Sequence, residues 1–248
     1  MSSAELPPSS ERHPPTRLLA LGRPVARRLV SAWYDVRISG APQVPSDGPV
    51  ILAANHIGWL DGPLLAALAP RPVHALTKTE MFHGAAGKLL CRAGQIPLDR
   101  FRTDMSAVRQ SLRVLRDGGT LGIFPEGKRG PGDLRRFHHG AAYLALVTGA
   151  PVVPVTFFGT RLPGGSSDSV PPRGARIDLV HGESWQVDQQ PWPRTKEQVL
   201  HASALLLQHM RRELDRARAL TGRDLPGPLP AGQTEKDPDT GFVNRGTP

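Results

Sequence analysis

Between residues 49 and 182, short apolar or β-branched runs alternate with segments of helical periodicity. The runs that favour strands are 49–55, 73–78, 95–99, 120–124, 151–159 and 176–182. The segments that favour helices are 61–69, 85–93, 105–115 and 139–149, and a final helix is predicted over 195–220. This alternation predicts one α/β layered domain, spanning 35–221, with a mostly parallel sheet flanked by helices.

The two ends of the chain differ from this middle part. Residues 1–16 and 222–248 are rich in polar residues and proline, so both are expected to be disordered. Residues 17–34 predict a basic amphipathic helix, with Leu18, Val25 and Trp33 on one face, and Pro24 is expected to begin a helix rather than to lie inside one. Two readings stay open: the helix lies among lipid headgroups, or it packs on its own domain with its arginines in water.

Charge and composition limit the classes of partner. Thirty-one Lys and Arg against 22 Asp and Glu give a net charge of +9, which favours anionic partners. Aromatic residues make up only 5%, and no zinc or RNA-binding signature is present, so nucleic acid is not expected as a partner. The single cysteine, Cys91, excludes an internal disulfide framework and a Cys-rich metal site. Neither a secretory signal peptide nor a transmembrane helix is predicted.

Four short blocks carry the chemistry. NHIGWLDG (55–62) follows a predicted buried strand directly, and a carboxylate five residues after a histidine can orient the ring as a general base. FPEGKRG (124–130) offers a carboxylate, a flexible glycine and two cations, and GQIPLDR (94–100) ends a strand with a charged pair. PVVPV (151–155) is apolar. Taken singly, the second and third blocks are most simply charged turns and the fourth is a core strand.

The order and spacing of these blocks resemble the four-block pattern of the glycerolipid acyltransferases, of the bacterial 1-acyl-sn-glycerol-3-phosphate acyltransferase type. The resemblance covers residues 35–185. It implies that His56 is the catalytic base and that Asp61 orients it. The positions that match the family's substrate-binding residues are Lys78, Gly94, Arg100, Glu126, Gly127 and Arg129, and Pro154 matches the proline of the last block.

The implied reaction is transfer of an acyl group from a thioester, carried by coenzyme A or acyl carrier protein, to the hydroxyl of 1-acyl-sn-glycerol-3-phosphate. The product is phosphatidic acid. No cofactor and no metal are implied, and the protein is expected at the cytoplasmic face of the membrane as a peripheral protein. Leu60, Leu64 and Phe82 are candidates for an acyl groove, although each is more simply explained as a core residue.

Two alternatives remain. Lys128 and Gly130 depart from the Thr and Ser usual beside the family's arginine, so another lysolipid, or a hydroxyl or amine acceptor, is an alternative substrate. A non-catalytic protein that binds anionic lipid is the alternative from a different class; binding alone needs neither His56 nor Asp61.

Overall fold

The computed structural model describes residues 7–190 and 194–233 of the chain. Its strands are β1 (Asp35–Ser39), β2 (Val50–Ala54), β3 (Val73–Lys78), β4 (Ile96–Leu98), β5 (Thr120–Ile123), β6 (Val152–Phe158) and β7 (Arg176–His181). Its α-helices are α1 (Arg17–Trp33), α2 (Asp61–Leu68), α3 (Gly84–Arg92), α4 (Met105–Arg116), α5 (Gly140–Thr148) and α6 (Lys196–Thr221). Two short 3-10 helices, η1 (Ala41–Gln43) and η2 (Thr79–Met81), complete the described elements.

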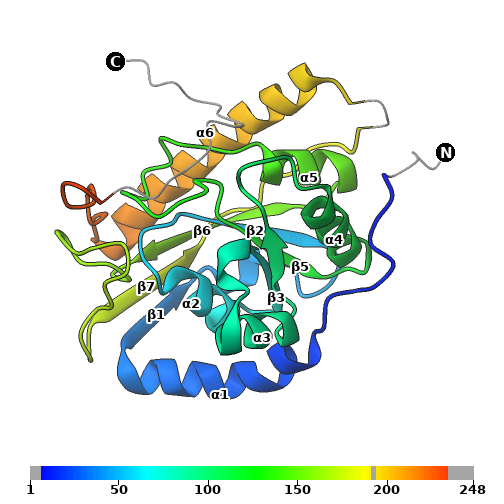
Figure 1. Cartoon of the computed structure of the whole chain (residues 1–248). Helices are drawn as coiled ribbons and strands as arrows, with labels where there is room; N and C mark the ends of the chain where they lie inside the picture. Colours follow the sequence, from blue (N-terminus) through cyan, green and yellow to red (C-terminus); the bar gives the residue numbers. More distant parts are fainter. Residues whose placement is uncertain (1–6, 191–193, 234–248) are drawn as a thin grey trace.

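The strands form one seven-stranded sheet in the order β1-β7-β6-β2-β5-β3-β4 (Figure 1). Strands β2 to β6 run parallel to one another, and only the β6–β7 pair is antiparallel. The predicted α/β domain with a mostly parallel sheet is therefore confirmed. All five parallel strands consequently end at the same edge of the sheet, which is where such folds bind ligands.

Helices cover both faces of the sheet (Figure 1). On β2, Ile51 and Ala53 belong to the core beneath α4, α5 and α6, while Val50, Leu52 and Ala54 belong to the core beneath α1 and α2. Because both faces are buried, β2 reads as a continuous apolar run rather than as an alternating one. This burial holds the strand end that precedes His56 in a rigid frame.

The structure corrects several expectations about the ends of the chain. Residues 7–16 lie against the domain: the Ser10 amide donates to the Arg109 carbonyl over 3.0 Å, and the His13 ring packs edge-on against His74. After α6, Leu225 packs against both cores. The expected disorder therefore does not hold for residues 7–16 and 222–233, whereas residues 1–6 and 234–248 lie outside the described residues.

Two local features also differ from expectation. Pro24 lies inside α1 rather than at its start, because the helix begins at Arg17 and the buried side chain of Leu19 anchors its first turns on the domain. Strand β1 was not predicted, since its sequence, DVRIS, carries two charges and lies at the edge of the sheet, where side chains remain partly exposed.

Candidate active site

The four sequence blocks meet at the shared edge of the sheet. His56 follows β2, Lys78 ends β3, Arg100 follows β4, and Glu126 follows β5. Strand β6, which contains Pro154, ends nearby and is followed by Gly159, Thr160 and Arg161. Segments that are distant in sequence thus contribute to one site because the carboxyl ends of parallel strands lie together.

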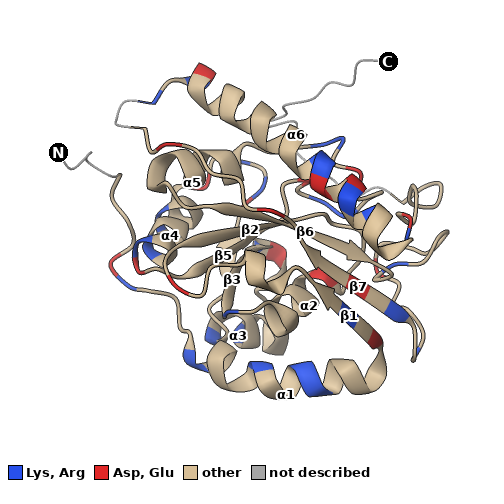
Figure 2. Cartoon of the chain, turned by 180° about the vertical axis from the view of Figure 1, so that it is seen from behind, with Lys and Arg blue, Asp and Glu red and all other residues tan. Residues whose placement is uncertain are grey.

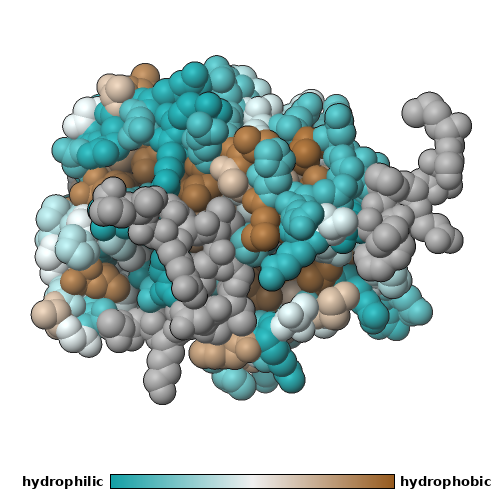
Figure 3. All heavy atoms as spheres, turned by 90° about the horizontal axis from the view of Figure 1, so that it is seen from above, coloured by the Kyte–Doolittle hydropathy of each residue, from teal (hydrophilic) through white to brown (hydrophobic). Residues whose placement is uncertain are grey.

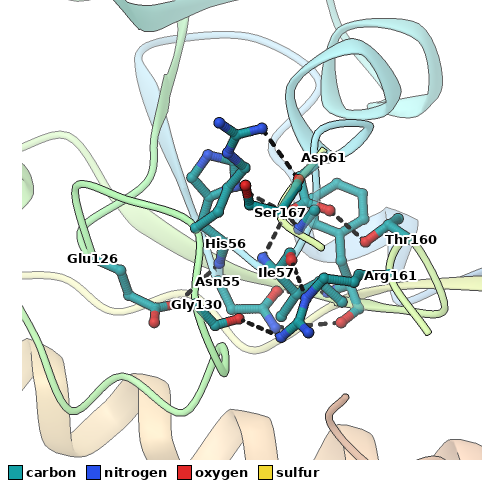
Figure 4. A network of polar contacts seen from close by, with 12 residues as sticks. Asn55, His56, Ile57, Asp61, Glu126, Gly130, Thr160, Arg161 and Ser167 are labelled. Carbon is teal, nitrogen blue, oxygen red and sulfur yellow. Dashed lines mark hydrogen bonds and ion pairs between the residues drawn. The ribbon is translucent and has the colours of Figure 1, made fainter. Parts of the chain in front are cut away.

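His56 and Asp61 form a hydrogen-bonded pair (Figure 4). The ring Nδ1 lies 2.8 Å from Oδ2 of Asp61, and since a carboxylate only accepts, Nδ1 is the donor. Nε2 is then the ring nitrogen left for a substrate, in a ring that lines the large cavity described below and stacks on Phe124 at 4.3 Å between centroids. This tautomer suits a general base.

The Asp61 carboxylate is wholly buried at the start of α2. Besides His56, its Oδ2 accepts the backbone N–H groups of Ile57 and Gly58, at 2.7 and 2.9 Å. Its Oδ1 accepts the hydroxyl of Thr160 at 2.5 Å. These donors replace the water that a buried carboxylate loses, so the aspartate can stay next to the imidazole in a fixed orientation.

Glu126 takes a different position from the one expected of a substrate ligand. Its side chain is 4% exposed, is not among the residues that line the cavity, and accepts the backbone N–H of His56 at 2.9 Å. Burial raises the pKa of this carboxyl to about 8, although the hydrogen bond from His56 acts in the opposite direction. Glu126 therefore supports the main chain of His56 instead of facing the cavity.

A cavity of about 860 Å³ opens beside His56. Lys78, Arg100, Gly127 and Arg129 line it, as the sequence predicts for an anionic substrate. Gly94 does not: its φ of +62° and its closeness to His74 give it a structural role. The apolar lining comes from other elements, including Trp59, Ala66, Leu76, Leu89, Leu90, Leu98, Val108 and Leu144.

The acyl-groove reading of Leu60, Leu64 and Phe82 is not supported, because all three are absent from the cavity wall. Leu64 is 1% exposed within the core between the sheet and α2, which is the reading that the sequence favoured. A helix turns only part of its apolar surface toward a given cavity, and position next to a motif does not reveal which part.

Two basic side chains in the cavity are already held by neighbours. Arg100 donates to the Gly127 carbonyl at 2.9 Å, which joins the GQIPLDR and FPEGKRG blocks. Arg129, only 8% exposed, forms an ion pair with Asp168 at 2.5 Å and donates to the Ser167 carbonyl at 3.1 Å. The loop between β6 and β7 thus reaches one of the predicted phosphate ligands.

Sequence reasoning missed three residues that organise the site. Asn55 pairs through its side-chain amide with the backbone of Phe157, at 2.7 and 3.3 Å, and so fixes the end of β2 to β6. The Thr160 hydroxyl donates to the Asp61 carboxylate, and the Arg161 guanidinium donates to the Ile57 carbonyl. In the sequence, the only sign of these roles is that the residues lie directly after a strand. This position becomes informative when the order of the strands in the sheet is known.

The chain matches a known protein family. A family model described as "Acyltransferase" matches residues 35–158, half of the 248-residue chain. The chain belongs to this acyltransferase family. The matched region includes His56, Asp61, Arg100 and Arg129, whereas Thr160 and Arg161 lie just beyond it.

Several named relatives are similar over part of their length. The 1-acyl-sn-glycerol-3-phosphate acyltransferase of Bacillus subtilis (strain 168) is 29% identical over 53% of this chain and 66% of its own length. The lyso-ornithine lipid O-acyltransferase of Pseudomonas aeruginosa is 37% identical over 53% of this chain and 54% of its own. The chloroplastic 1-acyl-sn-glycerol-3-phosphate acyltransferase of Arabidopsis thaliana is 30% identical over 68% and 46%. The chain thus spans about half to two thirds of the length of these relatives.

A solved structure shows the same fold. The crystal structure of the 1-acyl-sn-glycerophosphate acyltransferase from Thermotoga maritima aligns with a TM-score of 0.61 over 82% of this chain and 80% of that one, at 23% identity. Within residues 7–190 and 194–233, no helix is both long and apolar enough to cross a lipid bilayer.

Proposed function

We propose that this member of the acyltransferase family transfers a fatty acyl group from an acyl thioester to the free hydroxyl of 1-acyl-sn-glycerol-3-phosphate, forming phosphatidic acid. The observation that carries the proposal is the Nδ1–Oδ2 hydrogen bond of His56 and Asp61 at the wall of a large cavity with a mostly apolar lining. The names of the relatives from Bacillus and Arabidopsis support this choice of acceptor.

In the proposed reaction, Nε2 of His56 takes the proton of the acceptor hydroxyl as its oxygen attacks the thioester carbonyl carbon. Asp61 stabilises the imidazolium that forms. The carbon–sulfur bond then breaks, the acyl group stays on the acceptor oxygen, and the thiolate leaves and regains a proton from the imidazolium or from water. No enzyme nucleophile takes part, and no metal or other cofactor is required.

The basic part and the apolar part of the cavity would hold different parts of the substrates. Lys78, Arg100 and Arg129 would hold the phosphate, and the apolar wall formed by α3, α4 and the strands beside them would hold an acyl chain. Much of the rate would then come from holding the hydroxyl within reach of Nε2. The donor is a thioester of coenzyme A or of acyl carrier protein.

A second acceptor deserves a direct comparison. The relative from Pseudomonas is named for a lyso-ornithine lipid and is 37% identical, and Lys128 and Gly130 depart from the flanking residues usual in the family. A different lysolipid is therefore the alternative acceptor at the same site. Parallel assays with the two lysolipids decide between them.

The proposed place of action is the cytoplasmic face of the membrane, in peripheral contact with anionic lipid. Helix α1 supports this proposal, because it exposes Leu21, Leu29 and Trp33 at 78, 67 and 53% and contains four arginines and no acidic residue (Figure 2). Its other side, through Leu19, packs on the domain. The packing reading therefore holds for this side of the helix, and contact with lipid is proposed for the exposed side.

The test is release of free thiol from an acyl-coenzyme A, with and without 1-acyl-sn-glycerol-3-phosphate. His56→Ala should lower acceptor-dependent release by about 10²- to 10⁴-fold, the usual effect of removing a general base. His201→Ala, which changes an exposed histidine on α6, is the control. Binding of His56→Ala to phospholipid vesicles should equal that of the unaltered protein.

Other outcomes are equally informative. Release that persists in His56→Ala contradicts the assigned base. Absence of release from both coenzyme A and acyl carrier protein thioesters, with either lysolipid, together with intact vesicle binding, would favour the non-catalytic lipid-binding alternative.

A further inference from the structure

The Asp61 carboxylate depends on a residue outside the four sequence blocks. Three donors from the loop after β2 crowd its Oδ2, and the Thr160 hydroxyl is the donor recorded for its Oδ1. Thr160 follows β6, is 0% exposed, and does not line the cavity. Its hydrogen bond sets the rotation of the carboxylate about the side chain, and hence the direction in which Oδ2 faces the imidazole.

Arg161 joins several segments around the same pair (Figure 4). The side chain is 1% exposed, and its guanidinium donates to the backbone carbonyls of Ile57, Gly130, Gly165 and Gly227 at 2.7, 3.0, 3.1 and 2.6 Å. These carbonyls come from the His56 loop, the FPEGKRG loop, the β6–β7 loop and the segment after α6. One buried cation therefore holds the base-bearing loop against the loop that bears Arg129.

The backbone adds to this attachment. The Gly130 amide donates to the His56 carbonyl at 2.9 Å, so the two loops are joined directly as well as through Arg161. Gly58 lies so close to the backbone of Thr160 that an added Cβ would come within 2.8 Å of its carbonyl oxygen. The His56 loop is thus fitted onto the Thr160–Arg161 turn with no spare space.

We propose that Thr160 and Arg161 are positioning residues of the His56–Asp61 pair: Thr160 orients the carboxylate, and Arg161 fixes the His56 loop against the loop that bears Arg129. The kinetic part of this inference rests on the acyl transfer proposed above. Neither side chain lines the cavity, so both act through Asp61 and the loop.

The kinetic test uses Thr160→Val and Thr160→Ser. Thr160→Val keeps the shape and removes the hydroxyl; it should lower kcat roughly tenfold, the effect expected for a hydrogen bond to a charged group, and leave KM for the acceptor near its original value. Thr160→Ser keeps the hydroxyl and should restore most of kcat. Thr120→Val is the matched control, because Thr120 is also buried and its hydroxyl has no recorded hydrogen-bond partner.

The loop test uses Arg161→Lys and Arg161→Gln. Neither side chain can donate to the four carbonyls that Arg161 holds, so kcat per folded protein should fall roughly tenfold or more in Arg161→Gln. Arg161→Lys keeps the charge but lacks the planar fork, so it should restore only part of kcat. Arg71→Gln is the control, because Arg71 similarly donates to three main-chain carbonyls, of Pro45, Gly48 and Gly118, before β2 and after α4.

A measurement without substrate separates this inference from the proposed reaction. The NMR signal of the His56 Nδ1 proton, which reports the hydrogen bond to Asp61, should change in Arg161→Gln and in Thr160→Val but not in Arg71→Gln and Thr120→Val. An unchanged signal, with kcat reduced only in proportion to the folded fraction, would overturn the inference. A changed signal in a protein that transfers no acyl group would uphold the inference and reject the proposed reaction. If Arg161→Gln does not fold, the comparison of Thr160→Val with Thr160→Ser decides.

Discussion

Two buried carboxyl groups, those of Asp61 and Glu126, lie next to His56 in different surroundings. The Asp61 oxygens accept hydrogen bonds from the His56 ring, from two backbone N–H groups and from the Thr160 hydroxyl. Glu126 is equally buried, but burial together with the neighbouring Asp61 and Asp133 raises its pKa to about 8. Near neutral pH, Glu126 is therefore mostly a neutral acid that accepts the His56 amide, which avoids a second negative charge next to Asp61.

The protonation of Glu126 predicts a pH dependence of stability. The folded-state pKa, about 8, exceeds the ordinary 4.5, so the folded state binds one more proton than the unfolded state between these values. The Glu126 contribution is fully present below pH 4.5 and is lost as the pH rises toward 8, by up to about 1.4 kcal/mol for each pH unit. Relative to Glu126→Gln, whose amide does not titrate, the unaltered protein should lose free energy of unfolding across this window. Urea melts of both proteins at several pH values measure it, and parallel curves would contradict it.

Residue roles could be predicted only where a side chain belongs to a recognisable block. His56, Arg100 and Arg129 line the cavity because each follows a parallel strand, and this could be predicted from the strand and helix alternation. Glu126 belongs to a block but turns inward, and the sequence has no feature that distinguishes the two directions. Thr160 and Arg161 contact residues about a hundred positions earlier, so their roles depend on β6 lying next to β2.

At the scale of elements, α1 combines two surfaces. Leu19, Ala26 and Val30 face the domain, whereas Leu21 and Leu29 lie on a neighbouring stripe that is mostly exposed. On the face over α6, by contrast, hydrophobic residues form patches separated by hydrophilic ones (Figure 3). A continuous apolar stripe with arginines beside it suits the boundary between lipid headgroups and acyl chains.

The apolar stripe of α1 predicts a separable effect on membrane binding. Leu21→Asn combined with Leu29→Asn should weaken binding to vesicles that contain anionic lipid by at least about tenfold, because each leucine would otherwise bury apolar area in lipid. The melting temperature should change little, since both side chains are exposed in the folded domain. Leu220→Asn, on α6 with a leucine 66% exposed, is the control. Equal loss of binding in the control would show that α1 is not the contact.

Some helices and strands could be predicted from the sequence more readily than others. Buried strands such as β2 and β6 and the helices that follow them are clear in the sequence because both faces of the sheet select apolar residues. The edge strand β1 lacks that selection, and the position of Pro24 inside α1 reflects packing of the preceding turns through Leu19. The antiparallel β6–β7 pair could not be inferred from local patterns, since a long loop separates the two strands.

At the scale of the whole molecule, charge and topology act over different distances. The sheet brings the site residues within hydrogen-bonding reach, while a net charge of +9 would attract the chain to a membrane of anionic lipid before contact. That long-range attraction depends on salt, because the Debye length falls from about 30 Å at roughly 0.01 M to about 10 Å at roughly 0.1 M. At the lower concentration the whole molecule contributes to attraction, and at the higher one only charges near the lipid do.

This dependence on salt predicts how two charge-reversal variants will differ in binding to anionic vesicles. Arg28→Glu on α1 and Arg212→Glu on α6 change the net charge equally, and both arginines are exposed. At roughly 0.01 M salt, both should weaken binding to anionic vesicles by similar factors, because the field of each charge extends over a distance comparable to the protein. At roughly 0.1 M, only Arg28→Glu should still weaken it, since only α1 would lie within a Debye length of the lipid. Vesicle co-sedimentation across a salt series measures both effects. A larger loss of vesicle binding for Arg212→Glu at the higher salt concentration would place the membrane against α6. Lipid substrates would then have to enter the cavity from that side.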